Sequence, residues 1–475
     1  MSALAHASAA ELASRIRSRE VSSVEIVEDL LARLDRCRNL NAFITVTADV
    51  ARAQARDADR EIAAGRYRGP LHGIPVTLKD LIDTRGIRTT CGSRILAEHV
   101  PSQDATVTVR LREAGAVLVG KAALHEFAYG VTTNNPHFGA TRNPWDTERI
   151  PGGSSGGSGA AVAAGLGPVS LGTDTGGSIR IPGALCGVVG LKPAFGRVSR
   201  HGVFPLSWSL DHVGPLTRTV EDAALVLQAI AGPDARDPAT LGHALPDFMD
   251  ALRRPVAGLR VGVASDAYHR EMTEDLHTTF QEALRVLGTL GIHLEDVAPP
   301  RSAETAIAQT TIIMSEAASV HERWLRERPE DYGPEVRARL RRGQFFTATQ
   351  YLRAQKVRTL LAHEVGDLLR PYAALVLPTT PCVAPLITQD TVVIGDHTSD
   401  ARSVLTRMTR FANFTGLPAI TVPCGFGAGD MPVGLQIVGR SMDEATVLAI
   451  ARAYEQATPW HARRPPEPAG ASAVR

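Results

Sequence analysis

Two stretches, Pro151-Gly152-Gly153-Ser154-Ser155-Gly156-Gly157-Ser158-Gly159 and Thr173-Asp174-Thr175-Gly176-Gly177-Ser178-Ile179-Arg180, decide how this chain folds and what it does. Glycine and serine runs usually form flexible linkers. Here, however, the alanine-rich residues 160–164 follow the first stretch directly and must pack. Glycines in a buried turn bring backbone N–H groups close to an anion or to a developing oxyanion. Both stretches therefore predict parts of an active site.

Several familiar catalytic patterns can be excluded around these stretches. Gly152-x-Ser154-x-Gly156 formally matches the nucleophile elbow of α/β-hydrolases, but that elbow follows a strand, and residues 143–151 are typical of a loop. The chain has no glycine-rich phosphate-binding motif placed between a strand and a helix. His125-Glu126 and His321-Glu322 lack the second histidine of a zinc-binding HExxH motif. What remains is a serine hydrolase without an obvious histidine partner.

A lysine can replace that histidine. Only four of the 51 basic residues are lysines, namely Lys79, Lys121, Lys192 and Lys356. Lys79 comes at the end of a short strand pattern that begins after Pro75. Burial in an apolar, glycine-rich pocket disfavours the charged form of a lysine, and a neutral lysine can accept a proton from a serine hydroxyl. Lys121 and Lys192 lie in apolar strand patterns and are interpreted as scaffold.

With these residues in place, the sequence resembles the amidase signature family, hydrolases with a Ser–cis-Ser–Lys triad. The family's Lys-Asp pair is present as Lys79-Asp80, its GGSSGGS stretch as residues 152–158, and its TDTGGSIR segment as residues 173–180. The resemblance is dense over residues 8–235 and thinner over 346–457. It also covers shorter segments: 186–193, 196–199, 209–215, 219–223, 415–418 and 432–436.

The resemblance implies a role for each matching residue. Ser178 would be the nucleophile, Ser154 the relay hydroxyl next to a cis peptide bond, and Lys79 the base that later returns the proton. The backbone N–H groups of Thr175, Gly176, Gly177 and Ser178 would form the oxyanion hole. Many members carry Ile where this chain has Thr175, a harmless change if the backbone is the donor. Supporting roles fall to residues beside the triad: Ser155, Asp174 and Arg180.

The main functional hypothesis is a free-standing bacterial-type amidase that cleaves a C–N acyl bond through an acyl-enzyme on Ser178. Carboxamides, including aryl amides, carbamates (urethanes) and esters are the substrates that the resemblance implies. The alternative is the A subunit of a glutamine-dependent aminoacyl-tRNA amidotransferase, which releases ammonia from glutamine for a partner subunit. Residues 407–416 and 332–337 look more like free-standing amidases and favour the first hypothesis.

Composition limits the partners. The 475 residues carry a formal net charge of +1, so no overall field attracts nucleic acid or an acidic membrane. The five cysteines are scattered and never form a CxxC pair, which favours a reducing compartment. No signal peptide or membrane span is apparent. We therefore expect a soluble, cytoplasmic enzyme with no cofactor and no metal, a small-molecule amide or carbamate substrate, no nucleic acid or membrane partner, and possible homodimerisation.

Strand and helix patterns alternate along the chain, which predicts an α/β fold with a central mixed sheet covered by helices on both faces. No linker is apparent, so a single catalytic domain over residues 1–475 is expected. Its parts would be N-terminal helices at about 8–66, a signature core at about 70–232, a C-terminal part at about 258–460 and a frayed tail at 462–475.

Overall fold

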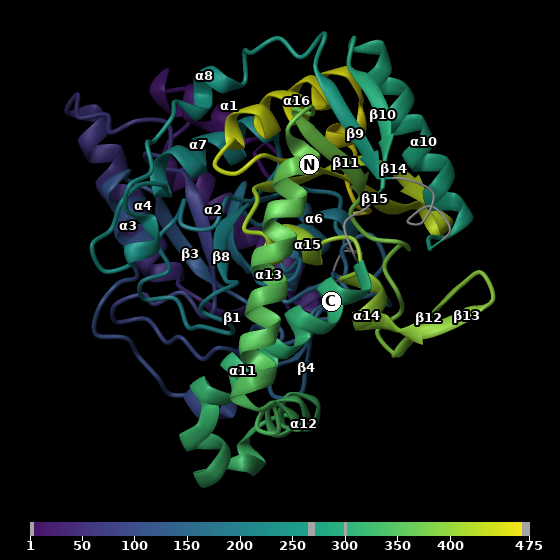
Figure 1. Cartoon of the computed structure of the whole chain (residues 1–475). Coiled ribbons are helices and arrows are strands. Elements are labelled where there is room, and N and C mark those ends of the chain that lie inside the picture. Colours follow the sequence, from purple (N-terminus) through teal and green to yellow (C-terminus); the bar gives the residue numbers. More distant parts are fainter. Residues whose placement is uncertain (1–3, 265–270, 299–301, 468–475) are drawn as a thin grey trace.

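The structure is a computed structural model that describes residues 4–264, 271–298 and 302–467 (Figure 1). The predicted frayed tail is described as far as Glu467, whose carboxylate pairs with Arg33 at 3.0 Å. Residues 468–475 lie outside the described residues.

An eleven-stranded mixed sheet runs through the molecule, and it confirms the predicted α/β class. Strands from the two halves of the chain meet where β7 pairs antiparallel with β14. The order across the sheet is β1 (Phe43–Val46), β3 (Val117–Ala122), β2 (Pro75–Lys79), β6 (Val169–Asp174), β8 (His212–Thr217), β7 (Val189–Lys192), β14 (Ala419–Gly427), β15 (Met431–Gly439), β11 (Ala374–Pro378), β9 (Arg260–Ala264) and β10 (His293–Val297).

The strands that carry the predicted catalytic residues lie side by side. β2 runs parallel to both β3 and β6, so Leu78 pairs with Leu171 and Lys79 with Ala122. All residues of these three strands are buried, as expected for parallel strands covered on both faces. Parallel strands end at the same edge, so Lys79 and Asp174 emerge on one side of the sheet.

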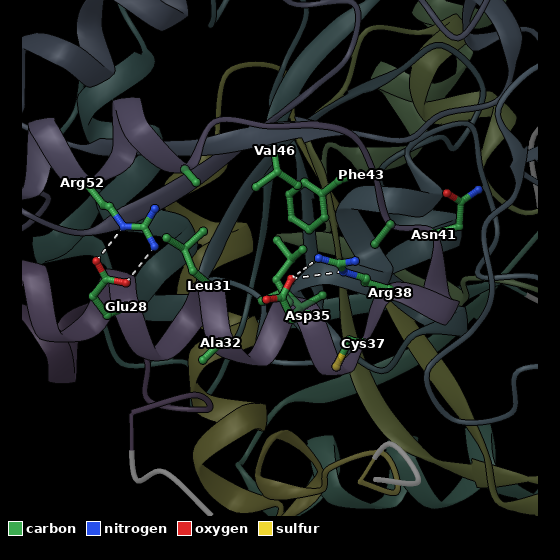
Figure 2. A pocket seen from close by; sticks show the side chains of 14 residues that line it. Glu28, Leu31, Ala32, Asp35, Cys37, Arg38, Asn41, Phe43, Val46 and Arg52 are labelled. Carbon is green, nitrogen blue, oxygen red and sulfur yellow. Dashed lines mark hydrogen bonds and ion pairs between the residues drawn. The ribbon is translucent and has the colours of Figure 1, made fainter. Parts of the chain in front are cut away.

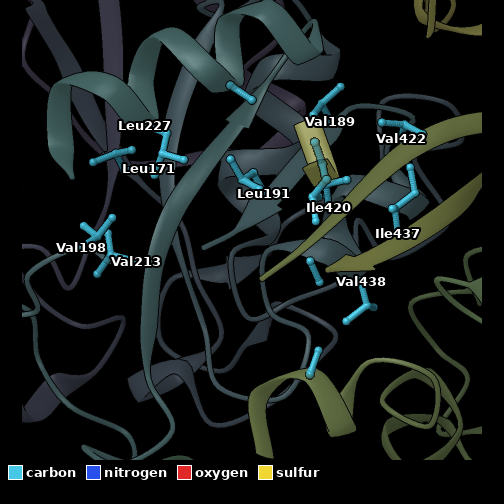
Figure 3. Packing of buried hydrophobic residues seen from close by; sticks show 14 of the residues in the cluster. Leu171, Val189, Leu191, Val198, Val213, Leu227, Ile420, Val422, Ile437 and Val438 are labelled. Carbon is cyan, nitrogen blue, oxygen red and sulfur yellow. The ribbon is translucent and has the colours of Figure 1, made fainter. Parts of the chain in front are cut away.

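Valine, leucine and isoleucine side chains fill the core on both sides of the junction between the two halves (Figure 3). Leu171 and Leu191 belong to the first half, and Ile420 and Ile437 to the second. Each of these four side chains is fully buried. Because the two halves share this core and this sheet, the geometry at the end of β2 is fixed by residues far away in the sequence.

Helices pack against the sheet (Figure 1). Capping boxes at Ser8 and Ser22 start the first two helices, within the predicted N-terminal helical region. The helices are α1 (Ala9–Arg17), α2 (Ser23–Arg36), α3 (Ala48–Ala63), α4 (Thr106–Glu113), α5 (Gly156–Ala163), α6 (Arg180–Leu185), α7 (Val220–Ile230), α8 (Phe248–Ala251), α10 (Glu274–Thr289), α11 (Ser302–Glu327), α12 (Pro334–Gly343), α13 (Ala348–Leu369), α14 (Ala401–Leu405), α15 (Arg410–Phe414) and α16 (Glu444–Ala457).

The structure differs from the sequence expectation in the N-terminal region, and it adds two details elsewhere. Residues 43–46, inside the predicted N-terminal helical region, form the edge strand β1, because their branched and aromatic side chains pair with β3. Helix α5 begins at Gly156, so the glycine-serine stretch supplies its first turn. A hairpin of β12 (Thr391–Ile394) and β13 (His397–Asp400) precedes α14. Among the described residues, no helix is long and apolar enough to cross a membrane.

Candidate active site

Lys79 ends strand β2 in a fully buried position. Its Nζ donates a hydrogen bond to Ser154 Oγ at 2.7 Å and another to Thr173 Oγ1 at 2.8 Å. Burial lowers the pKa of Lys79 from 10.5 to about 7, although the carboxylates of Asp211 and Asp174 oppose the shift. At neutral pH a substantial fraction of Lys79 is therefore uncharged and able to accept a proton.

Ser154 lies in the turn between residue 151 and helix α5, and the peptide bond from Gly153 to Ser154 is cis. The Ser154 carbonyl accepts a hydrogen bond from the backbone N–H of His125 at 3.1 Å. A Cβ on Gly153 would lie 2.8 Å from the backbone carbonyl carbon of Val131, so only glycine fits there. Ser155 N–H donates to the Ser178 carbonyl at 3.3 Å, which joins this turn to the turn of the predicted nucleophile.

Asp174 organises the turn that carries Ser178. Its carboxylate accepts hydrogen bonds from the backbone N–H groups of Gly177 at 2.7 Å and Ile179 at 3.1 Å, and from two guanidinium nitrogens of Arg180, each at 3.0 Å. Asn413 Nδ2 donates a further bond at 2.8 Å. Burial alone would raise the pKa of Asp174, but the Arg180 guanidinium outweighs it and holds the pKa well below its usual range. The pair is thus a fully buried, hydrogen-bonded ion pair.

Of the four backbone N–H groups predicted to form the oxyanion hole, this hydrogen-bond network already engages one. The Gly177 N–H already donates to Asp174, whereas Thr175, Gly176 and Ser178 border a cavity of about 310 Å³. Gly177 has a φ of +130°, and a Cβ there would lie 2.3 Å from Thr409 Oγ1, so a side chain would displace the turn. We infer that three backbone N–H groups, rather than four, are available to an oxyanion.

The supporting residues lie behind the reacting groups. Ser155 Oγ donates to the Thr173 carbonyl at 3.1 Å and accepts from the Thr173 N–H at 3.3 Å. Arg180 also donates to Gln436 Oε1 at 2.5 Å and to Asn413 Oδ1 at 2.6 Å, so it ties the nucleophile turn to the second half of the sheet. The catalytic and supporting roles of all these residues stay predictions, now with their contacts described.

Sequence reasoning missed two residues of the site. Thr173 accepts a hydrogen bond from Lys79, and Asp211 accepts one from Thr175 Oγ1 at 2.5 Å. Burial raises the pKa of Asp211 to about 6, in spite of its hydrogen bonds. Both residues lie inside segments that carry the family resemblance, which was the available signal. The Thr175 side chain therefore forms a hydrogen bond of its own, although the sequence-based expectation concerned only its backbone N–H.

Another hollow of about 670 Å³ lies away from these residues, between α2, β1 and α3 (Figure 2). Two ion pairs border it, Arg52 with Glu28 and Arg38 with Asp35. It holds none of the predicted catalytic side chains. No group of three or more His, Cys, Asp or Glu side chains with metal-binding geometry occurs among the described residues.

Comparison with known proteins places this geometry in context. The A subunit of glutamyl-tRNA(Gln) amidotransferase from Roseiflexus sp. (strain RS-1) is 42% identical, over 94% of this chain and 96% of that protein. The solved structure of the same type of subunit from Thermotoga maritima superposes with a TM-score of 0.81 at 36% identity, covering 98% of both chains. A third structure has a TM-score of 0.91 at 37% identity, covering 95% of this chain and 98% of that chain. It is an inhibitor-bound vestigial protein complex that reveals the evolutionary origins of an s-triazine catabolic enzyme.

These relatives correct the functional prediction. The prediction of a free-standing amidase rather than an amidotransferase A subunit is wrong, because curated relatives at about 40% identity over nearly the whole chain are A subunits. The prediction had relied on residues 407–416 and 332–337, which lie at or close to the cavity wall that Arg410 and Arg339 line.

The prediction of partners is wrong as well. It combined a small-molecule amide or carbamate substrate with no nucleic acid and possible homodimerisation. The relatives are subunits of an enzyme named for glutamyl-tRNA(Gln), which does not fit a lone chain that has no connection to nucleic acid. The near-neutral net charge did not reveal this connection, because net charge reports only the overall field of the chain.

The family itself is clear. Residues 25–448 match the Amidase family, and the matched region contains Lys79, Ser154 and Ser178. The chain therefore belongs to the Amidase family and is an enzyme that acts on C–N bonds.

Proposed function

We propose that this chain is the glutamine-hydrolysing A subunit of a glutamyl-tRNA(Gln) amidotransferase. The observation that carries the proposal is the end-to-end match to A subunits, which covers 94–97% of this chain and 96–99% of the first relatives. The hydrogen bond from Lys79 to Ser154 beside Ser178 supports the chemistry. Glutamine is a linear carboxamide, which is the bond that a serine–lysine site of this kind can open.

The first half of the reaction forms an ester on Ser178. Ser178 Oγ attacks the side-chain amide carbon of glutamine while its proton passes through Ser154 to neutral Lys79. The carbonyl oxygen becomes an oxyanion facing the N–H groups of Thr175, Gly176 and Ser178. The tetrahedral intermediate collapses when Lys79 returns the proton through Ser154 to the nitrogen. The C–N bond breaks and ammonia leaves.

The second half regenerates the enzyme. Water attacks the glutamyl ester, Lys79 again accepts the proton through Ser154, and glutamate leaves when Ser178 recovers its proton. The ammonia then passes to a partner subunit that amidates glutamyl-tRNA. Carbamate and ester cleavage need the same nucleophile and stay predictions.

Two measurements test this function. The first is release of glutamate and ammonia from L-glutamine by the purified chain and by Ser178→Ala, with mass spectrometry to locate a glutamyl ester on Ser178. The second combines the chain with the other subunits of the Geobacillus stearothermophilus enzyme and measures amidation of glutamyl-tRNA. We expect glutamine-dependent activity in both, lost in Ser178→Ala. An enzyme that hydrolyses other amides but forms no glutamyl ester would contradict the proposal.

A further inference from the structure

Arginines form one wall of the cavity that Ser178 borders. Four line it: Arg339 and Arg342 from α12, Arg402 from α14, and Arg410 from α15. The lining contains a single acidic residue, Asp400. The segments that misled the assembly prediction supply or adjoin this wall, since Arg410 lies within 407–416 and Arg339 follows 332–337 closely.

Two carboxylates, those of Glu335 and Asp400, interact with these four arginines. Arg339 pairs with Glu335 and donates to the Tyr129 carbonyl. In the described part of the chain, no carboxylate oxygen lies within 4.0 Å of the guanidinium nitrogens of the other three. Arg410 Nε donates to the neutral Thr406 hydroxyl at 2.7 Å, and Arg402 lies over the Tyr129 ring at 5.3 Å.

The arginines also repel one another. Burial, followed by the positive charge of Arg402, lowers the pKa of both Arg339 and Arg410 to about 10. Asp400 opposes the shift at both, yet one of its carboxylate oxygens already caps α14 by accepting the Ser403 N–H at 2.9 Å. A cavity wall with this excess of positive charge stabilises an anion and destabilises a cation.

We propose that the arginine wall selects linear amides whose acyl chain carries a carboxylate and no ammonium group, with Arg402 and Arg410 holding the carboxylate. This inference rests on the proposed function only for the amide-opening chemistry at Ser178, because glutamine itself meets only half of the requirement. Its carboxylate suits the guanidinium groups, which bind such anions through paired hydrogen bonds. Its ammonium enters a wall whose only acid, among the described residues that line it, is Asp400. Glutaramate, which is glutamine without the amino group, is therefore the better ligand.

The experiment separates binding from turnover. Calorimetry measures the binding of glutaramate and of L-glutamine to the Ser178→Ala variant, in which neither amide is consumed. Steady-state assays of the wild-type protein measure ammonia release from both amides and from neutral butyramide. We expect glutaramate to exceed glutamine at least about tenfold in affinity and in kcat/KM, because like charges brought together are unfavourable.

Substitutions in the wall identify the residues that carry the preference. Arg402→Gln and Arg410→Gln should each weaken glutaramate binding about 10- to 100-fold, the effect of losing a charged hydrogen-bond donor, and should change butyramide turnover far less. Arg407→Gln is the matched control, because Arg407 lies on the same segment but pairs with Glu271 and does not line the cavity. It should leave glutaramate binding unchanged.

Each outcome decides between the two proposals. Equal or tighter binding of glutamine than of glutaramate overturns the arginine-wall inference and leaves the glutaminase proposal standing. Preferential glutaramate binding without any glutamine turnover supports the wall and overturns the glutaminase proposal. Glutaramate binding that is unchanged in both Arg402→Gln and Arg410→Gln would also overturn the inference.

Discussion

The two walls of the catalytic cavity hold their charges in opposite ways. Behind Ser178, Asp174 and Arg180 are fully buried and neutralise each other, and four backbone or amide donors complete the carboxylate's contacts. On the wall formed by α12, α14 and α15, Arg402 and Arg410 are half-buried, and within the described chain neither has a carboxylate oxygen within ion-pair distance. A balanced buried pair fixes geometry, whereas unbalanced charge at a cavity is available to a ligand. We therefore expect the first group to position the reaction and the second to select the substrate.

The largest effect on amide turnover is expected from removing the hydroxyl of Ser178. Ser178→Ala should lower amide turnover by about 10⁴-fold or more, because in the proposed mechanism only this hydroxyl forms the acyl-enzyme. Thermal unfolding should be nearly unchanged. Ser158→Ala is the matched control: that buried hydroxyl donates to the Leu171 carbonyl and does not border the cavity. Labelling of Ser154 instead of Ser178 by a fluorophosphonate would show that the nucleophile is misassigned.

Substitutions of Lys79 test whether this side chain transfers a proton or only supplies a positive charge. Because the pKa of Lys79 is about 7 and its neutral form is the base, kcat/KM should rise with pH through about 7 and level off above it. Lys79→Arg should be as damaging as Lys79→Ala, about 10³-fold or more, since a guanidinium stays charged. The Lys356→Arg variant, changed at a position away from the cavity, should keep the wild-type profile. Near-normal amide turnover in Lys79→Arg would contradict the proton path.

The two walls also differ in how far the sequence could predict them. The positioning wall is built largely within residues 151–180, where local glycine and serine patterns and a family resemblance were visible. Of the three predicted triad residues, only Lys79 lies outside that range, at the end of a short strand that the sequence also indicates. The arginine wall is assembled from α12, α14 and α15, and nothing in the sequence says that these helices meet across a cavity. Their residues were noticed but interpreted as evidence about assembly.

Missed contacts have the same physical origin. Asp211 is 36 residues from Thr175, and Thr173 is 94 residues from Lys79, so each pair forms only because the strands are neighbours. The edge strand β1 was missed because four residues between helices give too short a pattern to distinguish. Resemblance supplied the roles of Ser154 and Lys79; spacing alone did not.

Asp174→Asn tests whether a buried ion pair contributes more to the free energy of unfolding than an exposed one. The substitution leaves Arg180 buried without a counter-ion, so the free energy of unfolding should fall by about 3–5 kcal/mol, with loss of activity as the nucleophile turn relaxes. Asp57→Asn removes an exposed partner of Arg60 and should change stability by less than about 1 kcal/mol. Urea denaturation of both variants measures the difference. Equal losses would mean that burial does not distinguish the two pairs.

Thr175→Val should have the smallest effect, and its direction is informative. The hydroxyl of Thr175 donates to Asp211, so its loss removes a bond that stabilises the carboxylate and should raise the pKa of Asp211 above about 6. A protonated Asp211 no longer favours the ammonium form of Lys79, whose pKa should then fall. The acid limb of the kcat/KM profile should therefore move to lower pH by less than about one unit.

The plateau of that profile decides what the Thr175 hydroxyl does. If the backbone N–H alone serves the oxyanion, the plateau rate in Thr175→Val should stay within about tenfold of wild type. Thr175→Ser, which keeps the hydroxyl, should leave both the limb and the plateau in place. A plateau lower by more than about 100-fold in Thr175→Val, with normal activity in Thr175→Ser, would mean that the hydroxyl itself contacts the reacting atoms. In that case a residue assigned here to positioning would belong to the catalytic groups.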